Sequence, residues 1–107
     1  MPRNVDLNLL LPLQALLAER SVTRAADRLG LSQPATSAAL AKLRRHFDDD
    51  LLVRAGNSYQ LTPLAGQLIE RIATAIAATD RVFSSQPDFD PAVSDREFTV
   101  LMSDYAL

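Results

Sequence analysis

The sequence contains no cysteine and a single histidine, His46. Without cysteine the chain can form no disulfide, no thiolate metal site and no cysteine nucleophile. His46 has no partners in a local triad pattern, and no nucleotide-binding glycine loop occurs, so we expect no catalytic site, no metal and no cofactor. The absence of cysteine also fits a reducing compartment, and we expect a cytoplasmic protein.

Long apolar runs are also absent. None approaches the roughly 18 residues that a membrane span requires, so we expect no membrane partner. The first residues, MPRNVDLNLLLPL, contain too short an apolar region and no small-residue cleavage site for a signal peptide. Apolar residues nevertheless make up 48% of the 107 residues. That composition rules out general disorder and suffices for one small domain with an extension.

Acidic residues slightly outnumber basic residues, which gives a net charge of -2, but the basic residues are unevenly distributed. Between Arg20 and Phe47 six basic residues accompany one acid, Asp27, which gives a local charge of +5. From Asp80 onward six acids accompany two arginines, a local charge of -4. A basic patch on a mildly acidic protein is typical of nucleic-acid binding.

Leucines spaced mostly three or four residues apart predict a first helix over residues 6–20, with a broad apolar face. Pro12 lies inside this pattern, where a proline removes a backbone donor and clashes with the preceding turn. Either the helix begins later than the leucines suggest, or it bends at Pro12.

The run from Ser21 to Phe47 predicts two short helices around a tight turn, a pattern typical of helix-turn-helix DNA-binding proteins. Ser21 is a suitable N-cap for a helix over residues 23–29, and Gly30 is a suitable stop. The apolar stripe of this helix consists of Val22, Ala25, Ala26 and Leu29. Its small alanines let another helix cross closely, as the motif requires.

Ser32 is a suitable N-cap for the next helix, with Pro34 in the first turn. Its inward face is predicted to consist of Thr36, Leu40, Leu43 and Phe47. Its other side carries Gln33, Pro34, Ser37, Ala38, Ala41, Arg44 and Arg45. About fifteen residues give a rod of roughly 22 Å, long enough to lie in a DNA major groove. The small residues on the outer side allow close approach to base edges.

Two β segments follow, Leu51 to Arg54 and Tyr59 to Leu61, with Gly56-Asn57 as the turn between them. A hairpin packed against a helix-turn-helix is a wing. Thr62-Pro63 then indicates the start of a long helix that extends to about Ser84. A narrow stripe of coiled-coil type along this helix predicts dimerisation with a partner helix. The stripe consists of Leu64, Leu68, Ile72, Ala75, Thr79 and Val82.

Residues 84–95 are polar, contain two prolines and are predicted to form a linker. Residues 98–102 form a β-rich run that predicts a strand. A single strand is not stable without a partner strand to pair with. We therefore expect the sequence to hold the beginning of a second domain.

Three motifs, SVTRAADRLGLSQPATSAALAKL, LLVR and LTPLAG, occur in an order and spacing that resemble the N-terminal part of a LysR-type transcriptional regulator. The similarity covers about residues 7–85, and REFTVLMSDYA is similar to the first strand of that family's effector-binding domain. The chain is most similar to members that respond to aromatic or flavonoid-like compounds. The resemblance implies a mainly α fold with a winged helix-turn-helix (three helices and a two-stranded wing), followed by a long dimerisation helix.

The resemblance also implies domain boundaries and partners. The expected segments are a winged helix-turn-helix domain at 1–62, a linker and dimerisation helix at 63–85, and a hinge with the first strand of a truncated effector-binding domain at 86–107. The implied partners are double-stranded promoter DNA at a partly palindromic site and a second copy bound through the linker helix. The full-length protein would be a tetramer and would bind a small-molecule inducer only through its C-terminal domain.

Individual site residues follow from the same resemblance. The positions near bases are Gln33, Pro34 and Ser37, those near phosphate are Ser21, Thr23 and Ser32, and the wing arginine is Arg54. Four further basic residues complete the predicted DNA-binding set: Arg24, Lys42, Arg44 and Arg45. Ser103 lies where relatives begin to contact inducer. Alternatively, Gln33 is a solvated first-turn residue, Arg44 and Arg45 are a solvated helix end, and Arg54 pairs with a nearby aspartate.

Two positions depart from the family pattern. Ala38 stands where many relatives carry arginine or glutamine, so one potential base contact is absent. Asp48 replaces the usual glycine and opens the run Asp48-Asp49-Asp50, which would repel DNA unless these carboxylates turn away or pair with Arg44 or Arg45. The sequence thus predicts a sequence-specific DNA-binding and dimerisation region. The alternative is a helical protein-interaction module without DNA recognition.

Overall fold

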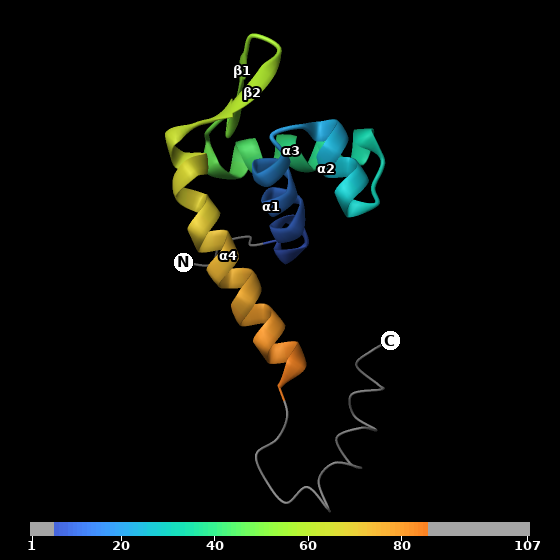
Figure 1. Ribbon diagram of the computed structural model, residues 1–107, viewed down its shortest axis with the longest axis vertical. Coiled ribbons are helices and arrows are strands. Elements are labelled where there is room, and N and C mark those ends of the chain that lie inside the picture. Colours follow the sequence, from blue (N-terminus) through green and yellow to red (C-terminus); the bar gives the residue numbers. More distant parts are fainter. Residues whose placement is uncertain (1–5, 86–107) are drawn as a thin grey trace, which may run out of the picture. The chain divides into compact units, whose positions relative to one another are not determined.

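The computed structural model describes residues 6–85, and Figure 1 shows how their helices and strands are arranged. The chain divides into two units, residues 1–77 and 78–107, and the core described below belongs to the first. In chain order the elements are the 3-10 helix η1 (Leu7–Leu9), α1 (Leu10–Glu19), α2 (Val22–Leu29), α3 (Gln33–Phe47), β1 (Leu52–Ala55), β2 (Ser58–Leu61) and α4 (Pro63–Ser84). The predicted mainly α fold with a two-stranded wing is confirmed. The predicted strand at 98–102 and Ser103 lie outside the described residues.

Pro12 marks the beginning of the first α-helix. A short 3-10 turn precedes it, capped by the Asp6 carboxylate, which accepts a hydrogen bond from the Asn8 backbone N–H at 2.9 Å. Because α1 begins only at Leu10, Pro12 lies in the first turn, where backbone N–H groups have no helical acceptor. Of the two alternatives for Pro12, the later helix start is therefore confirmed.

The helix-turn-helix is set by caps encoded in the sequence. The Ser21 hydroxyl accepts a hydrogen bond from the Arg24 N–H at 3.1 Å, and the Ser32 hydroxyl accepts one from the Ala35 N–H at 3.1 Å. Gly30 ends α2 with a φ of 69°, a left-handed conformation that glycine adopts without a steric penalty. Both predicted N-caps and the predicted stop are confirmed, and α2 starts one residue earlier than expected.

The core of the first unit draws residues from every α-helix and from the base of the wing. Its buried members are Leu13, Ala15, Leu16, Leu17, Ala25, Leu40, Leu43, Leu51, Leu52, Ala65, Leu68 and Ile72. Thr36 is the buried polar side chain within residues 6–85, and its hydroxyl donates to the Ser32 carbonyl at 3.0 Å, so no buried polar group of α3 lacks a partner. The predicted inward face of α3 is confirmed.

The wing is an antiparallel hairpin that projects from the helices in Figure 1. Its register pairs Leu52 with Leu61 and Arg54 with Tyr59. The two-residue turn begins at Gly56, whose φ is 64°, and glycine at this first turn position is typical of a type II′ hairpin. The strands agree with the predicted segments to within one residue at each end.

Helix α4 begins where the sequence predicts, but its apolar stripe is divided. The Thr62 hydroxyl caps the helix by accepting a hydrogen bond from the Ala65 N–H at 3.1 Å. Leu68 and Ile72 are buried in the core of their own chain, and Leu64 packs against that core. The remaining stripe positions, Ala75, Thr79 and Val82, are exposed. The stripe is thus not one continuous exposed seam, because its first half completes the intramolecular core.

Candidate nucleic-acid interface

The outer face of α3 carries short polar and small side chains. Gln33, Pro34, Ser37 and Ala38 are exposed, and Ala41 is half-buried one to two turns farther along the same face. On the same helix Thr36, Leu40 and Leu43 are buried, so the exposed residues border the edge of the core and point away from it. The helix therefore presents a surface of mostly short side chains with hydrogen-bonding groups, which a base edge can approach closely.

The two serine caps retain a donor for a ligand. In each case the hydroxyl oxygen of Ser21 or Ser32 accepts a backbone hydrogen bond, which leaves the hydroxyl hydrogen available for donation. Thr23 is exposed in the first turn of α2. The N-terminal turns of α2 and α3 thus place hydroxyl groups where a phosphate oxygen would find donors.

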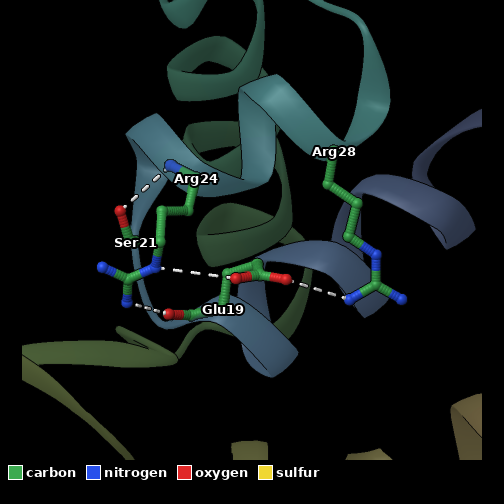
Figure 2. A network of polar contacts seen from close by, with 4 residues as sticks. All are labelled: Glu19, Ser21, Arg24 and Arg28. Carbon is green, nitrogen blue, oxygen red and sulfur yellow. Dashed lines mark hydrogen bonds and ion pairs between the residues drawn. The ribbon is translucent and has the colours of Figure 1, made fainter.

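Figure 2 shows two arginines of α2 on either side of Glu19, the last residue of α1. Arg24 donates to the Glu19 backbone carbonyl at 2.7 Å, and its Nε lies 3.6 Å from one carboxylate oxygen. Arg28 lies 3.4 Å from the other carboxylate oxygen. The Arg24 side chain is still 65% exposed, so its outer N–H groups can reach a second acceptor. Two guanidinium groups on one carboxylate leave this cluster with a net positive charge.

The basic end of α3 contains residues in two different environments. Lys42 and Arg45 are exposed and carry no side-chain hydrogen bond or ion pair within the described residues. Arg44 is half-buried, and it donates from Nε to the Asp50 carbonyl at 2.8 Å and from Nη2 to the Leu52 carbonyl at 2.9 Å. Lys42 and Arg45 are thus available to phosphate, whereas Arg44 is committed to the base of the wing.

Arg54 lies on the wing beside an aromatic ring. Its guanidinium carbon is 5.6 Å from the centre of the Tyr59 ring, within the range of a cation–π interaction. Between residues 6 and 85 the ion pairs are those of Glu19, so Arg54 does not pair with the nearby aspartates. The stacking leaves Arg54 exposed, with its charge available to a ligand.

The carboxylates of the three aspartates after α3 form no ion pair with Arg44 or Arg45 among residues 6–85. Asp48 adopts the left-handed conformation that ends the helix, with φ 50° and ψ 48°. The Asp49 carboxylate accepts hydrogen bonds from the Leu51 N–H at 2.8 Å and the Thr62 hydroxyl at 2.6 Å. Asp50 contributes its carbonyl to Arg44. Asp49 is therefore turned toward its own chain.

A groove of about 210 Å³ lies between α3 and the base of the wing. The lining residues are Val22, Ser37, Leu40, Arg44, Leu52 and Tyr59. It adjoins the exposed face of α3, since Ser37 belongs to both. The recognition face and the wing therefore border a common surface.

Some contributors to this surface escape a sequence-based search. Tyr59 is one, although the two-residue turn at Gly56-Asn57 already implies that it lies opposite Arg54. Glu19 is another, and its contact with Arg28 spans nine residues and two helices, for which the sequence contains no local signal.

Comparison with known proteins identifies the fold and its role. Residues 7–67 match the family model described as "Bacterial regulatory helix-turn-helix protein, lysR family". The chain belongs to the LysR family. DNA binding in a transcriptional regulator is therefore the role of this helix-turn-helix, and the family is one of regulators rather than enzymes.

The LysR assignment agrees with individual relatives. The chain is 44% identical over 104 residues to nodulation protein D 1 of Mesorhizobium japonicum, which covers 97% of this chain and 33% of that protein. A solved probable transcriptional regulator from Pseudomonas aeruginosa is 40% identical with a TM-score of 0.72, over 83% of this chain and 30% of that one. The BenM DNA-binding domain, solved in complex with catB site 1 DNA, is 26% identical with a TM-score of 0.69, over 75% and 90% of the two chains.

The chain spans about a third of the length of the curated relatives that it matches. Within residues 6–85 no helix is both long and apolar enough to cross a membrane.

Proposed function

We propose that this LysR-family domain lays α3 in the major groove of promoter DNA, with α2 and the wing against the flanking phosphates. The exposed face of α3 carries the proposal, because it combines an amide, a hydroxyl and small side chains with the free cations Lys42 and Arg45. The likeness to the BenM DNA-binding domain, solved with bound DNA, supports the same mode of docking.

The base contacts are proposed for the first two turns of α3. Gln33 can present its amide to an adenine edge through two hydrogen bonds, while Pro34 and Ser37 approach the neighbouring bases. Ala38 makes no polar base contact. Specificity consequently depends more on Gln33, Ser37, the wing and the deformability of the DNA.

The phosphate contacts are proposed for the helix N-termini and the exposed basic residues around them. These contacts are made by Ser21, Thr23, Arg24, Ser32, Lys42 and Arg45. Arg54 extends the interface from the wing, to a phosphate or into a minor groove. Its stacking on Tyr59 supports this role, because the ring holds the guanidinium without neutralising it.

Replacing Gln33 by Ala tests the base contact. The variant should bind the selected operator about 1–3 kcal/mol more weakly and should discriminate less at one base pair, because a bidentate contact is lost. Site selection from a random duplex pool followed by titration measures both effects. The matched control is Gln67→Ala, an exposed glutamine on α4. Equal weakening on all sequences would show that Gln33 reads no base.

The competing interpretation is a helical interaction module that does not bind DNA. The two interpretations predict different effects of salt. For a DNA-binding domain, a plot of log affinity for duplex against log salt concentration should have a negative slope, with each phosphate contact contributing about -0.9. Absence of duplex binding even at low salt would refute the DNA-docking proposal and favour the interaction module.

We further propose that the domain forms a homodimer through α4. Ile69 is 41% exposed and Phe83 is 70% exposed, and with the partly buried Ile76 they recur at seven-residue intervals, the period of a helix-pairing surface. Val82, 69% exposed, adjoins this stripe. This surface takes the place of Leu68 and Ile72, which are buried in the intramolecular core.

Replacing Phe83 by Asp should convert the dimer to monomers in sedimentation, because a carboxylate would be buried in the interface. Thr74→Asp places the same charge on another exposed position of α4 and should leave the dimer intact. An unchanged Phe83→Asp dimer would mean that α4 does not pair through this stripe.

In the full-length regulator we propose the segments 1–62, 63–85 and 86–107 as DNA-binding domain, dimerisation helix and the beginning of an effector-binding domain. That domain would bind a small aromatic or flavonoid-like inducer, for which the similarity to nodulation protein D is the support. Ser103 would be among the first contacts. The regulator would act as a tetramer in the bacterial cytoplasm.

A further inference from the structure

The chain turns sharply between α3 and the wing, over residues 49–52. Leu51 is fully buried and has a φ of 64°, a left-handed conformation that is strained for a branched apolar residue. A hydrogen bond spans Leu51 in a tight three-residue turn, since the Leu52 N–H donates to the Asp50 carbonyl at 2.6 Å. Such a turn persists only when its surroundings hold it in place.

Arg44 supplies a large part of that support. Its planar guanidinium donates to the Asp50 carbonyl at 2.8 Å and the Leu52 carbonyl at 2.9 Å, on the two sides of Leu51. A lysine could not reproduce this pattern, because it presents a point charge rather than a fixed fork of donors. Two donors of one side chain thus connect the last turn of α3 to the first residue of β1.

The other polar groups of the turn are also satisfied. The Asp49 carboxylate accepts from the Leu51 N–H, and the Leu51 carbonyl accepts from the Thr62 N–H at 3.0 Å. Thr62 in turn donates its hydroxyl to Asp49 and caps α4. Hydrogen bonds therefore hold the wing where it begins and where it ends. Those of Arg44 join its beginning to α3.

We propose that Arg44 is a positioning residue for the wing: it holds β1 against α3 so that Arg54 meets the DNA backbone, and it does not itself contact phosphate. Arg54 lies two residues beyond the carbonyl of Leu52 that Arg44 holds. Arg44 also lines the groove between α3 and the wing together with Tyr59, the residue on which Arg54 stacks. The inference rests on the proposed docking to DNA.

The test compares Arg44→Gln, Arg54→Gln and the double variant in duplex titrations over a range of salt concentrations. If Arg44 acts through Arg54, the double variant should have the affinity of Arg54→Gln alone, and its salt slope should be shallower than that of the wild type by about 0.9. If Arg44 is itself a phosphate contact, the two losses add and the slope falls by about 1.8. Additive losses would overturn the proposal, and so would an unchanged affinity of Arg44→Gln or an unchanged salt slope of Arg54→Gln.

Arg45→Gln is the matched control, because Arg45 is the exposed neighbour without a contact to the wing. Its loss should add to that of Arg54→Gln. Arg44→Lys keeps the charge and loses the fork, so it should weaken binding as Arg44→Gln does. Full affinity of Arg44→Lys would indicate a simple phosphate contact and would overturn the proposal.

A measurement without DNA separates this inference from the proposed function. Amide hydrogen exchange in Arg44→Lys and Arg44→Gln should accelerate at Leu51 and Thr62, while Leu16 in the core stays protected and shows that the domain is folded. Unchanged exchange at Leu51 and Thr62 would overturn the positioning role. Failure of the wild-type domain to bind any duplex at low salt would instead refute the proposed docking.

Discussion

Replacing Asp48 by Gly should stabilise the domain, although it removes a native side chain. Asp48 ends α3 in the left-handed region, with φ 50° and ψ 48°. The Asp49 N–H donates to the Arg44 carbonyl at 3.2 Å, which completes a Schellman motif around Asp48. The same motif ends α2, where the Leu31 N–H donates to the Ala26 carbonyl at 3.0 Å, but there the left-handed residue is Gly30.

The magnitude follows from three terms. A left-handed residue with a side chain costs about 1–2 kcal/mol, and aspartate lies at or below the lower end of this range because it tolerates this region. A carboxylate at the negative end of the helix dipole costs about 0.3–1 kcal/mol. Against these gains, glycine increases the conformational freedom of the unfolded chain, at a cost of about 0.4–1 kcal/mol. The net effect should be a stabilisation of about 0.5–1 kcal/mol.

Thermal unfolding followed by circular dichroism measures this effect, because 1 kcal/mol corresponds to about 4–8 °C in Tm for a domain of this size. Asp48→Ala is the matched control: it removes the carboxylate but keeps a Cβ at the same φ. We expect it to gain no more than the dipole contribution. If Asp48→Ala stabilises as much as Asp48→Gly, charge rather than backbone conformation is responsible. A lower Tm for Asp48→Gly would refute the reasoning altogether.

Two further predictions concern residues of α1. Leu16→Ala should lower the free energy of unfolding by about 3–5 kcal/mol, because the Leu16 side chain is fully buried in the core. Leu11→Ala is the control: its side chain is 56% exposed, so the loss should be far smaller, and urea denaturation of both variants measures the difference. Glu19→Gln should lower the free energy of unfolding by at most about 1 kcal/mol at low salt, because both arginine partners of Glu19 are partly exposed to solvent. The difference should shrink in 1 M salt. A Glu19→Gln effect that does not depend on salt would show that the carboxylate acts through something other than these ion pairs.

Features held by short-range hydrogen bonds could be predicted from the sequence. Ser21 and Ser32 cap helices through N–H groups three residues away, and Gly30 and Gly56 occupy left-handed positions. Residues that are neighbours in the chain determine these features, so the identities of a few side chains suffice. The outward face of α3 followed from the same local periodicity, whereas the candidate base contacts at Gln33 and Ser37 are implied by the LysR resemblance.

The candidate site was less predictable where it depends on contacts between elements. Arg44 has the spacing of a free basic residue at a helix end, and only the turn at Leu51 brings two backbone carbonyls within its reach. Arg24 likewise lies at an exposed helical position, and the carbonyl that it contacts belongs to the preceding helix. Nothing in the neighbouring sequence specifies either acceptor.

By itself the sequence determined the order of helices, the wing, the caps and the LysR resemblance, since each depends on local pattern and spacing. Tertiary structure alone decided what covers each apolar face. The periodicity of α4 identifies a stripe through Leu64, Leu68 and Val82, but burial divides it between the core of its own chain and an exposed remainder. The physical reason is that a hydrophobic face lowers its free energy against any apolar surface, so its pattern cannot specify which molecule supplies that surface.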